Sequence, residues 1–244
     1  MSLKKIAARL TLSLLAALSL AAHANETIRK VVETKFEVKV RSITKTNHLG
    51  LYEVVAGNQI IYSDEKATAF FLGNVIDAKT DTNVTESRLL EIGKQTYKPL
   101  IPSLPLDLAV KQVRGNGKGM VITFEDPNCG YCKKLARDIQ TLKDVTIYTF
   151  VLPILGENST KKAKDILCST DRVKVWNDWM INNTTPAAAK ADCKVSMDKI
   201  MMAGRSFEVT GTPTLVFSDG TRIPGAVPVA EIERKLAELA KKPG

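Results

Sequence analysis

The chain has few of the residues that build metal sites, with only two histidines and four cysteines in 244 residues. A structural zinc site needs four ligands, often supplied as two closely spaced pairs. Cys129 and Cys132 form one such pair, but Cys168 and Cys193 form no second C-x-x-C. The composition therefore disfavours zinc, and we expect neither a metal nor another cofactor.

Beyond its first 24 residues, the sequence has no apolar stretch long enough to cross a bilayer. The start itself combines three basic residues, a short apolar run at 10–20 and the A-x-A sequence Ala22-His23-Ala24. These are the three parts of a secretory signal peptide. We predict that residues 1–24 are removed after Ala24, rather than kept as a membrane anchor.

The sequence also lacks a phosphate-binding glycine loop, because residues 115–119 do not match G-x-x-x-x-G-K-[ST] and precede a strand pattern. The formal charge of +9 falls to +6 when the signal peptide, with three basic residues and no acid, is removed. The remaining charge is spread along the chain. It indicates a solvated basic surface, and we expect no nucleic-acid partner.

What the sequence does contain is the motif Cys129-Gly130-Tyr131-Cys132, between a β-rich run at 120–124 and a helical pattern. A turn at Pro127-Asn128 separates the two patterns. We therefore expect Cys129 at a helix N-terminus and Cys132 one turn inside. Unpaired N–H groups at that terminus stabilise a thiolate, so Cys129 is the candidate nucleophile and Cys132 the candidate resolving thiol.

The N-terminal block, residues 25–85, alternates apolar and polar residues and has few helices. It predicts a short helix, a strand that starts at Phe36, and hairpins around 56–58 and 73–74. So thin a sheet leaves a strand edge exposed, and exposed edges invite pairing with another chain. A helical run and a proline cluster then mark residues 86–106 as a linker.

Residues 107–244 predict a second domain. A helix is expected at 107–114, and the motif helix stands between strands at 120–124 and 145–152. Strand, C-x-x-C helix and strand form the βαβ context of a thioredoxin-like redox motif. Helices between 159 and 207, then a hairpin and a last helix, complete an α+β protein. Because an exported chain meets an oxidising compartment, its four cysteines allow three pairings, of which Cys129–Cys132 with Cys168–Cys193 is the most economical.

Three features carry a resemblance: the C-G-Y-C motif, Gly211-Thr212-Pro213-Thr214 with the hairpin after it, and the small N-terminal block. Together they resemble the DsbC family of periplasmic thiol:disulfide isomerases over the whole mature chain. The resemblance implies a C-terminal thioredoxin-like domain with a helical insertion. It also implies a cystatin-like N-terminal dimerisation domain, joined to the first by a linker helix.

The resemblance further implies a periplasmic, V-shaped homodimer held together by residues 25–85, with two catalytic domains facing a shared cleft. Cys168 and Cys193 match the structural disulfide of the family. The Thr–cis-Pro pair beside the active cysteines is expected to offer its backbone to a substrate strand. The substrate-binding residues would be Thr212, Pro213, Gly130 and Tyr131.

The function that this resemblance implies is isomerisation of incorrect disulfides in exported client proteins. Such an enzyme has to be kept reduced, so a DsbD-like membrane thiol reductase is an expected partner. Two alternatives stay open at this point. The protein could be a dithiol oxidase, which rests oxidised, or a chaperone-like binder of unfolded clients in which the cleft matters more than the thiols.

One feature beside the motif differs from thioredoxin, which has a buried acid on the strand before its C-x-x-C. Here the strand contains no acid until Glu125. We interpret Glu125 as a surface or loop carboxylate, with proton acceptor for Cys132 as the alternative. Lys133 directly follows the motif and could add to the stabilisation of the thiolate.

Overall fold

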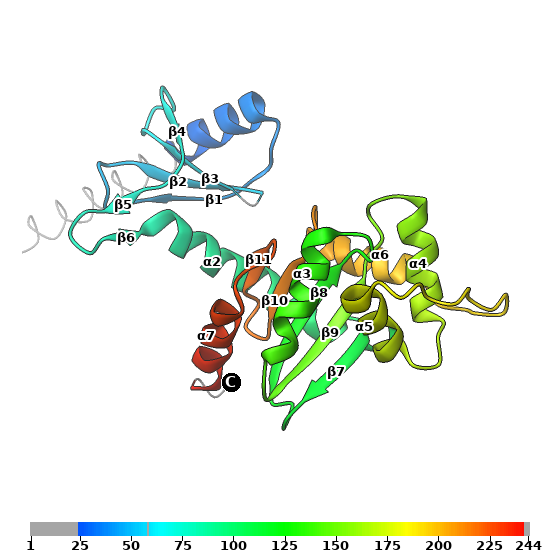
Figure 1. Ribbon diagram of the computed structural model, residues 1–244. Helices are drawn as coiled ribbons and strands as arrows, with labels where there is room; N and C mark the ends of the chain where they lie inside the picture. Colours follow the sequence, from blue (N-terminus) through cyan, green and yellow to red (C-terminus); the bar gives the residue numbers. More distant parts are fainter. Residues whose placement is uncertain (1–23, 58, 242–244) are drawn as a thin grey trace, which may run out of the picture. The chain divides into compact units, whose positions relative to one another are not determined.

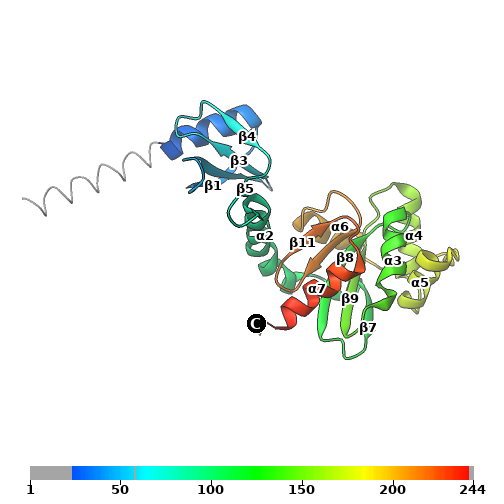
Figure 2. The same cartoon turned by 60° about the vertical axis from the view of Figure 1, so that its left-hand side comes forward.

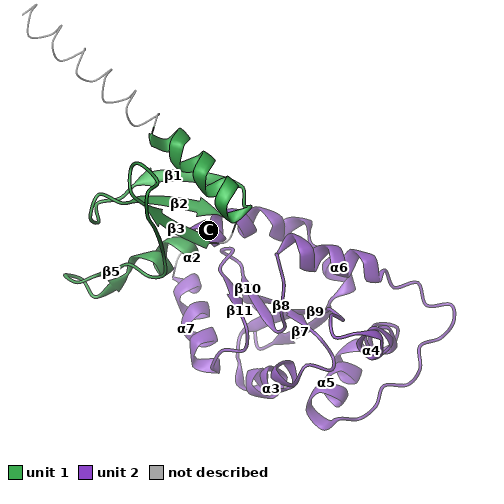
Figure 3. Ribbon diagram, turned by 90° about the horizontal axis from the view of Figure 1, so that it is seen from above, with its two compact units in different colours: residues 1–89 green, residues 90–244 purple. Residues whose placement is uncertain are grey.

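The computed structural model of the protein describes residues 24–57 and 59–241 (Figure 1). The predicted signal peptide therefore lies outside the described residues, except for Ala24. The chain divides into two compact units, Met1–Leu89 and Leu90–Gly244 (Figure 3). Within the described part, no helix has the length and apolar character needed to cross a membrane.

The first unit packs one helix, residues 24–36, on a four-stranded antiparallel sheet in the order β1-β2-β3-β4. Ile28 and Val32 of the helix are fully buried against Val54 and Ile61 of the two central strands. A two-stranded ribbon follows the sheet. The strands of this unit are β1 Val40–Lys45, β2 Tyr52–Ala56, β3 Gln59–Ser63, β4 Phe70–Leu72, β5 Ile76–Asp77 and β6 Thr82–Asn83.

The structure confirms the hairpin expected around 56–58, where β2 pairs antiparallel with β3. The strand expected from Phe36 exists but begins only at Val40, because Phe36 ends the helix and its ring packs edge-on against Phe70. Phe36 follows Ile28 and Val32 at a spacing of four residues, which places all three on one face of a helix. The hairpin expected around 73–74 is wrong, since β4 pairs with β3 while β5 pairs with β6.

The second unit contains a five-stranded sheet in the order β11-β10-β8-β9-β7, in which β8 and β9 are parallel and the other pairs antiparallel. Figure 2 shows helix α7 in front of this sheet. Helix α2, Val84–Tyr97, includes the boundary between the two units. The elements that follow it are β7 Val110–Arg114, β8 Gly119–Glu125, α3 Gly130–Asp138, β9 Val145–Val151, α4 Glu157–Leu167, α5 Arg172–Asn182, α6 Met197–Ser206, β10 Thr214–Phe217, β11 Arg222–Pro224 and α7 Val229–Ala240.

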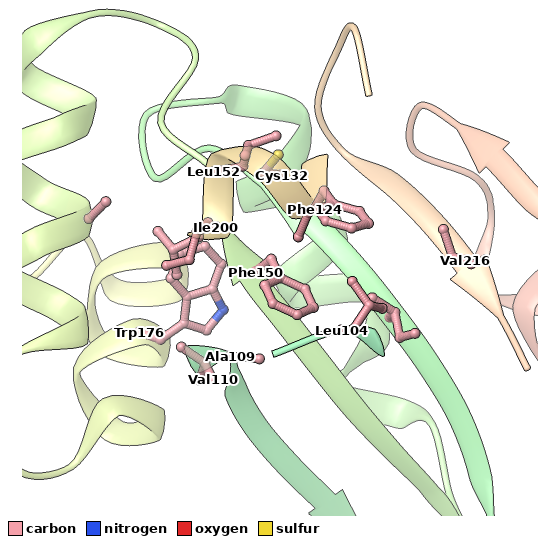
Figure 4. Close-up of a cluster of buried hydrophobic side chains, with 14 of the residues drawn as sticks. Leu104, Ala109, Val110, Phe124, Cys132, Phe150, Leu152, Trp176, Ile200 and Val216 are labelled. Atoms are coloured by element: carbon pink, nitrogen blue, oxygen red, sulfur yellow. The ribbon is translucent and has the colours of Figure 1, made fainter. Parts of the chain in front are cut away.

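Alternate side chains of the strands enter two separate cores. Val121 and Leu215 belong to the core under α3 and α7, together with Leu135 and Ile232. The opposite face, with Phe124 at its centre, packs against α4, α5 and α6, and Figure 4 shows Phe124, Phe150 and Trp176 in this second core. Helix α3 is thus fixed to the sheet by the burial of its apolar side chains.

The segment expected to be a linker, residues 86–106, supplies three buried side chains to the second core: Tyr97, Ile101 and Leu104. Tyr97 stacks on Phe207 with ring centroids 5.6 Å apart, and Leu104 is labelled in the core in Figure 4. The C-terminal half of this segment is therefore part of the packing of the second unit.

The helix expected at 107–114 is wrong. A short 3₁₀ turn, Leu106–Leu108, is followed by the edge strand β7, which pairs with β9. Val110 and Gln112 are buried in β7 while Lys111 and Val113 are exposed. This alternation is hard to recognise in the sequence, because the buried position 112 is a glutamine and the exposed position 113 is a valine.

Candidate active site

The two cysteines of the motif occupy the positions that the sequence predicts. Cys129 is the N-cap residue of α3, in extended backbone conformation, and its carbonyl oxygen accepts a 3.0 Å bond from the Lys133 amide. Cys132 lies in the first turn. Both are free thiols, but Cys129 keeps 8% of its surface exposed while Cys132 keeps none. Only Cys129 is therefore open to a thiol reagent or a client disulfide.

A buried aspartate that sequence reasoning missed fixes the loop before Cys129. Asp126 accepts bonds from the Asn128 amide and the Ser159 hydroxyl, both at 2.7 Å, and from the Leu155 amide at 2.9 Å. These bonds tie the loop to the start of α4. An aspartate beside a proline is typical of an ordinary turn, so this role cannot be recognised from the sequence.

The segment 211–214 lies beside Cys129, although 83 residues separate them in sequence. The Thr212–Pro213 peptide bond is cis, and the Cys129 thiol donates a 3.3 Å hydrogen bond to the Thr212 carbonyl oxygen. Gly130 has open space where a Cβ would be, and Tyr131 is 70% exposed. The structure thus gathers the four expected substrate-binding residues around the nucleophile candidate.

Glu125 is fully buried at the end of β8, so its interpretation as a surface or loop carboxylate is wrong. The strand continues to Glu125 because this residue pairs in parallel with Val151. Its Oε1 lies 2.7 Å from the Thr123 hydroxyl, whereas Oε2 has no hydrogen-bond partner among the described residues. Thr123 and Glu125 share the face that carries Val121, which is the face under α3.

The buried pair formed by Glu125 and Cys132 has unusual acid–base properties. Burial raises the pKa of Glu125 to about 7, against the opposing effect of hydrogen bonds with Thr123 and Thr149. Burial also raises the pKa of Cys132, and the negative charges of Glu125 and Cys129 raise it further. Cys132 therefore stays protonated at neutral pH, and its activation needs a proton acceptor nearby.

The other two cysteines are joined by a disulfide, with Cα atoms of Cys168 and Cys193 5.9 Å apart. The closed loop spans 25 positions and contains α5. It is separate from the active site in sequence, but α5 packs against α3. The disulfide therefore anchors the helical insertion that lies against the active-site helix.

Replacing both Cys168 and Cys193 with alanine is expected to lower the free energy of unfolding by about 3.5 kcal/mol, the loop-closure value for a ring of this size. The thiols of Cys129 and Cys132 should still react with an alkylating reagent. Thermal or urea unfolding measures the loss. An unchanged unfolding curve would mean that the bond contributes nothing to stability.

The comparisons with known proteins agree with this architecture. Residues 106–240 match the family of thioredoxin-like domains, and residues 19–86 match the N-terminal domain of disulfide bond isomerase proteins. The probable thiol:disulfide interchange protein DsbC of Bordetella pertussis is 43% identical over 197 residues, covering 81% of this chain and 68% of that protein. DsbC of Escherichia coli K12 is 27% identical over 236 residues, covering 94% of each.

Among solved structures, the disulfide interchange protein from Neisseria gonorrhoeae is 37% identical, with a TM-score of 0.52, covering 55% of this chain and 97% of that one. The fold, the matches and the paired thiols define an enzyme of thiol:disulfide exchange built on a thioredoxin-like domain. Within that class, the chain belongs to the DsbC family of thiol:disulfide interchange proteins.

Proposed function

We propose that this protein is a periplasmic disulfide isomerase that acts on wrongly oxidised exported proteins. The observation that carries this proposal is the separate N-terminal domain. Residues 24–83 build their own sheet and core, although simple thiol exchange needs only the thioredoxin-like domain. A separate dimerisation domain gives a client a second contact, so that it stays bound through several exchanges.

In the proposed reaction, the Cys129 thiolate attacks one sulfur of a client disulfide. A Cys129–client disulfide forms, the client's own bond breaks, and the released client sulfur takes up a proton. Another client thiolate then attacks the mixed disulfide and releases Cys129, so the client is isomerised without net oxidation or reduction. Thr212, Pro213, Gly130 and Tyr131 would hold the client strand during these steps.

Cys132 is proposed to release a client that stays bound to Cys129. Its thiolate attacks the Sγ atom of Cys129, the client leaves with two reduced thiols, and a Cys129–Cys132 disulfide remains. Two electrons must then be returned to the enzyme, which is why we assign it a DsbD-like membrane thiol reductase as partner. Thiol trapping of the protein in cells tests this point, because a dithiol oxidase would be found oxidised and an isomerase reduced.

We assign residues 1–24 to a signal peptide cleaved after Ala24, 25–85 to dimerisation, 86–106 to the linker and 107–244 to catalysis. The dimer is proposed to form through a free edge of the N-terminal sheet. Edge strand β4 supports this assignment, because Phe71 and Leu72 are 54% and 61% exposed. Light scattering of the mature protein measures its oligomeric state.

A Cys132→Ala variant is expected to accumulate mixed disulfides with clients, because the internal release route is gone. A Cys129→Ala variant should accumulate few, since the remaining thiol is fully buried. Non-reducing gels of both variants after expression in the periplasm make the comparison. Equal trapping by the two variants would contradict the division into nucleophile and resolving thiol.

A further inference from the structure

Two lysines from different helices contact the ring of one tryptophan near the active-site loop. The Nζ atoms of Lys133 (α3) and Lys162 (α4) lie 3.9 and 3.7 Å from the ring centroid of Trp179 (α5). All three side chains are partly exposed. Two ammonium groups so close to one ring make a local concentration of positive charge that is open to solvent.

Neither lysine has a carboxylate partner among the described residues. Three other lysines on these helices each form an ion pair with an aspartate four residues further along the chain. These pairs are Lys134–Asp138, Lys161–Asp165 and Lys174–Asp178. The polar contact of Lys133 is a neutral one, 2.5 Å from the side-chain oxygen of Asn183.

The charges that act on Lys133 are positive. Burial lowers the pKa of Lys133, and the neighbouring cations Lys162 and Arg137 lower it further. An anion bound close to the ammonium groups would relieve this repulsion. Both lysines keep N–H donors for such an anion, because an ammonium group has three.

The cluster is tied directly to the active-site loop. The Trp179 indole Nε1 donates a 2.5 Å hydrogen bond to the carbonyl oxygen of Pro127, two residues before Cys129. Lys133 directly follows Cys132 in α3. A group bound by these lysines therefore lies close to the loop that carries Cys129.

We propose that Lys133, Lys162 and Trp179 form a subsite for a carboxylate side chain of the client, close in sequence to the disulfide that Cys129 attacks. This inference rests on the proposed function and adds to it a substrate preference for disulfides with acidic neighbours. The two ammonium groups bind the carboxylate, and the indole ring fixes their positions through cation–π contacts.

Three peptides test the subsite, each with one disulfide and a flanking Glu, Gln or Lys. The reduced full-length protein should react with the Glu peptide about threefold faster than with the Gln peptide, as expected for a partly exposed ion pair. Lys162→Gln should bring this ratio close to one, as should high salt. Lys161→Gln is the matched control, because Lys161 is on the same helix but pairs with Asp165, and it should keep the ratio.

The controls separate a binding role from an effect on the thiol. If Lys162→Gln slows all three peptides equally, and slows alkylation of Cys129 by neutral iodoacetamide as well, the lysine acts on the thiolate and the subsite is overturned. An unchanged Glu-to-Gln ratio in Lys162→Gln, or an equal fall in Lys161→Gln, overturns it too. If the wild-type protein reacts with none of the three peptides, the proposed function is contradicted, and so is the subsite.

Discussion

A protein that begins at Leu90 is expected to fold as a monomer, to keep simple thiol exchange and to lose most of its isomerase activity. The cut follows the boundary between the two compact units. It removes the N-terminal sheet but keeps Tyr97, Ile101 and Leu104, which pack in the core of the catalytic domain. Loss of the second contact should reduce isomerisation of a multi-disulfide client by tenfold or more.

Light scattering, a scrambled-ribonuclease assay and exchange with a single-disulfide peptide test this expectation. The peptide reaction is the internal control, because it needs only Cys129 and its surroundings. A second truncation at Leu106 should unfold more readily, since it removes three buried side chains that each stabilise the fold by roughly 1.5–3 kcal/mol. A full-length monomer with full isomerase activity would contradict the role assigned to the N-terminal domain.

The redox motif was the most predictable part of the site. A strand pattern, a turn and a helix pattern placed Cys129 at a helix N-terminus, and α3 begins directly after it. These signals are local, so a short window of sequence contains them. The hairpin of β2 and β3 was predictable for the same reason.

Features that depend on distant partners were not predictable. Asp126 becomes a buried anchor only because Ser159 and Leu155 donate to it. Strand β7 forms because it pairs with β9, although the sequence of β7 alone does not distinguish a strand from a helix. Glu125 is buried because β8 extends one residue further alongside β9, which no count of apolar residues reveals.

The buried carboxyl of Glu125 leads to the second large expected effect, a dependence of stability on pH. Its folded-state pKa of about 7 lies above the ordinary value of 4.5. The folded protein therefore binds the proton more tightly than the unfolded chain. Protonation of Glu125 therefore contributes about 3 kcal/mol to the free energy of unfolding. This contribution is fully present below pH 4.5 and is lost as the pH rises through 7.

Between pH 4.5 and pH 8, the wild-type free energy of unfolding should therefore fall by about 3 kcal/mol more than that of Glu125→Gln. For each protein, the free energy of unfolding at one pH is compared with its own value at the other pH. A pH-independent cost of burying the introduced amide therefore cancels. Glu157→Gln is the matched control, because Glu157 is exposed on the first turn of α4 and should leave the wild-type profile unchanged. Urea unfolding at a series of pH values measures all three proteins.

The same substitution tests whether Glu125 accepts the proton of Cys132. Cys132 must lose a proton before it can attack the mixed disulfide, and burial opposes that loss. A neighbouring base with a pKa near 7 is suited to receive the proton. Release of a client peptide from Cys129 should therefore become about a hundredfold slower in Glu125→Gln and lose its inflection near pH 7. Unaltered release with an altered stability profile would leave Glu125 as a buried acid without a part in the exchange.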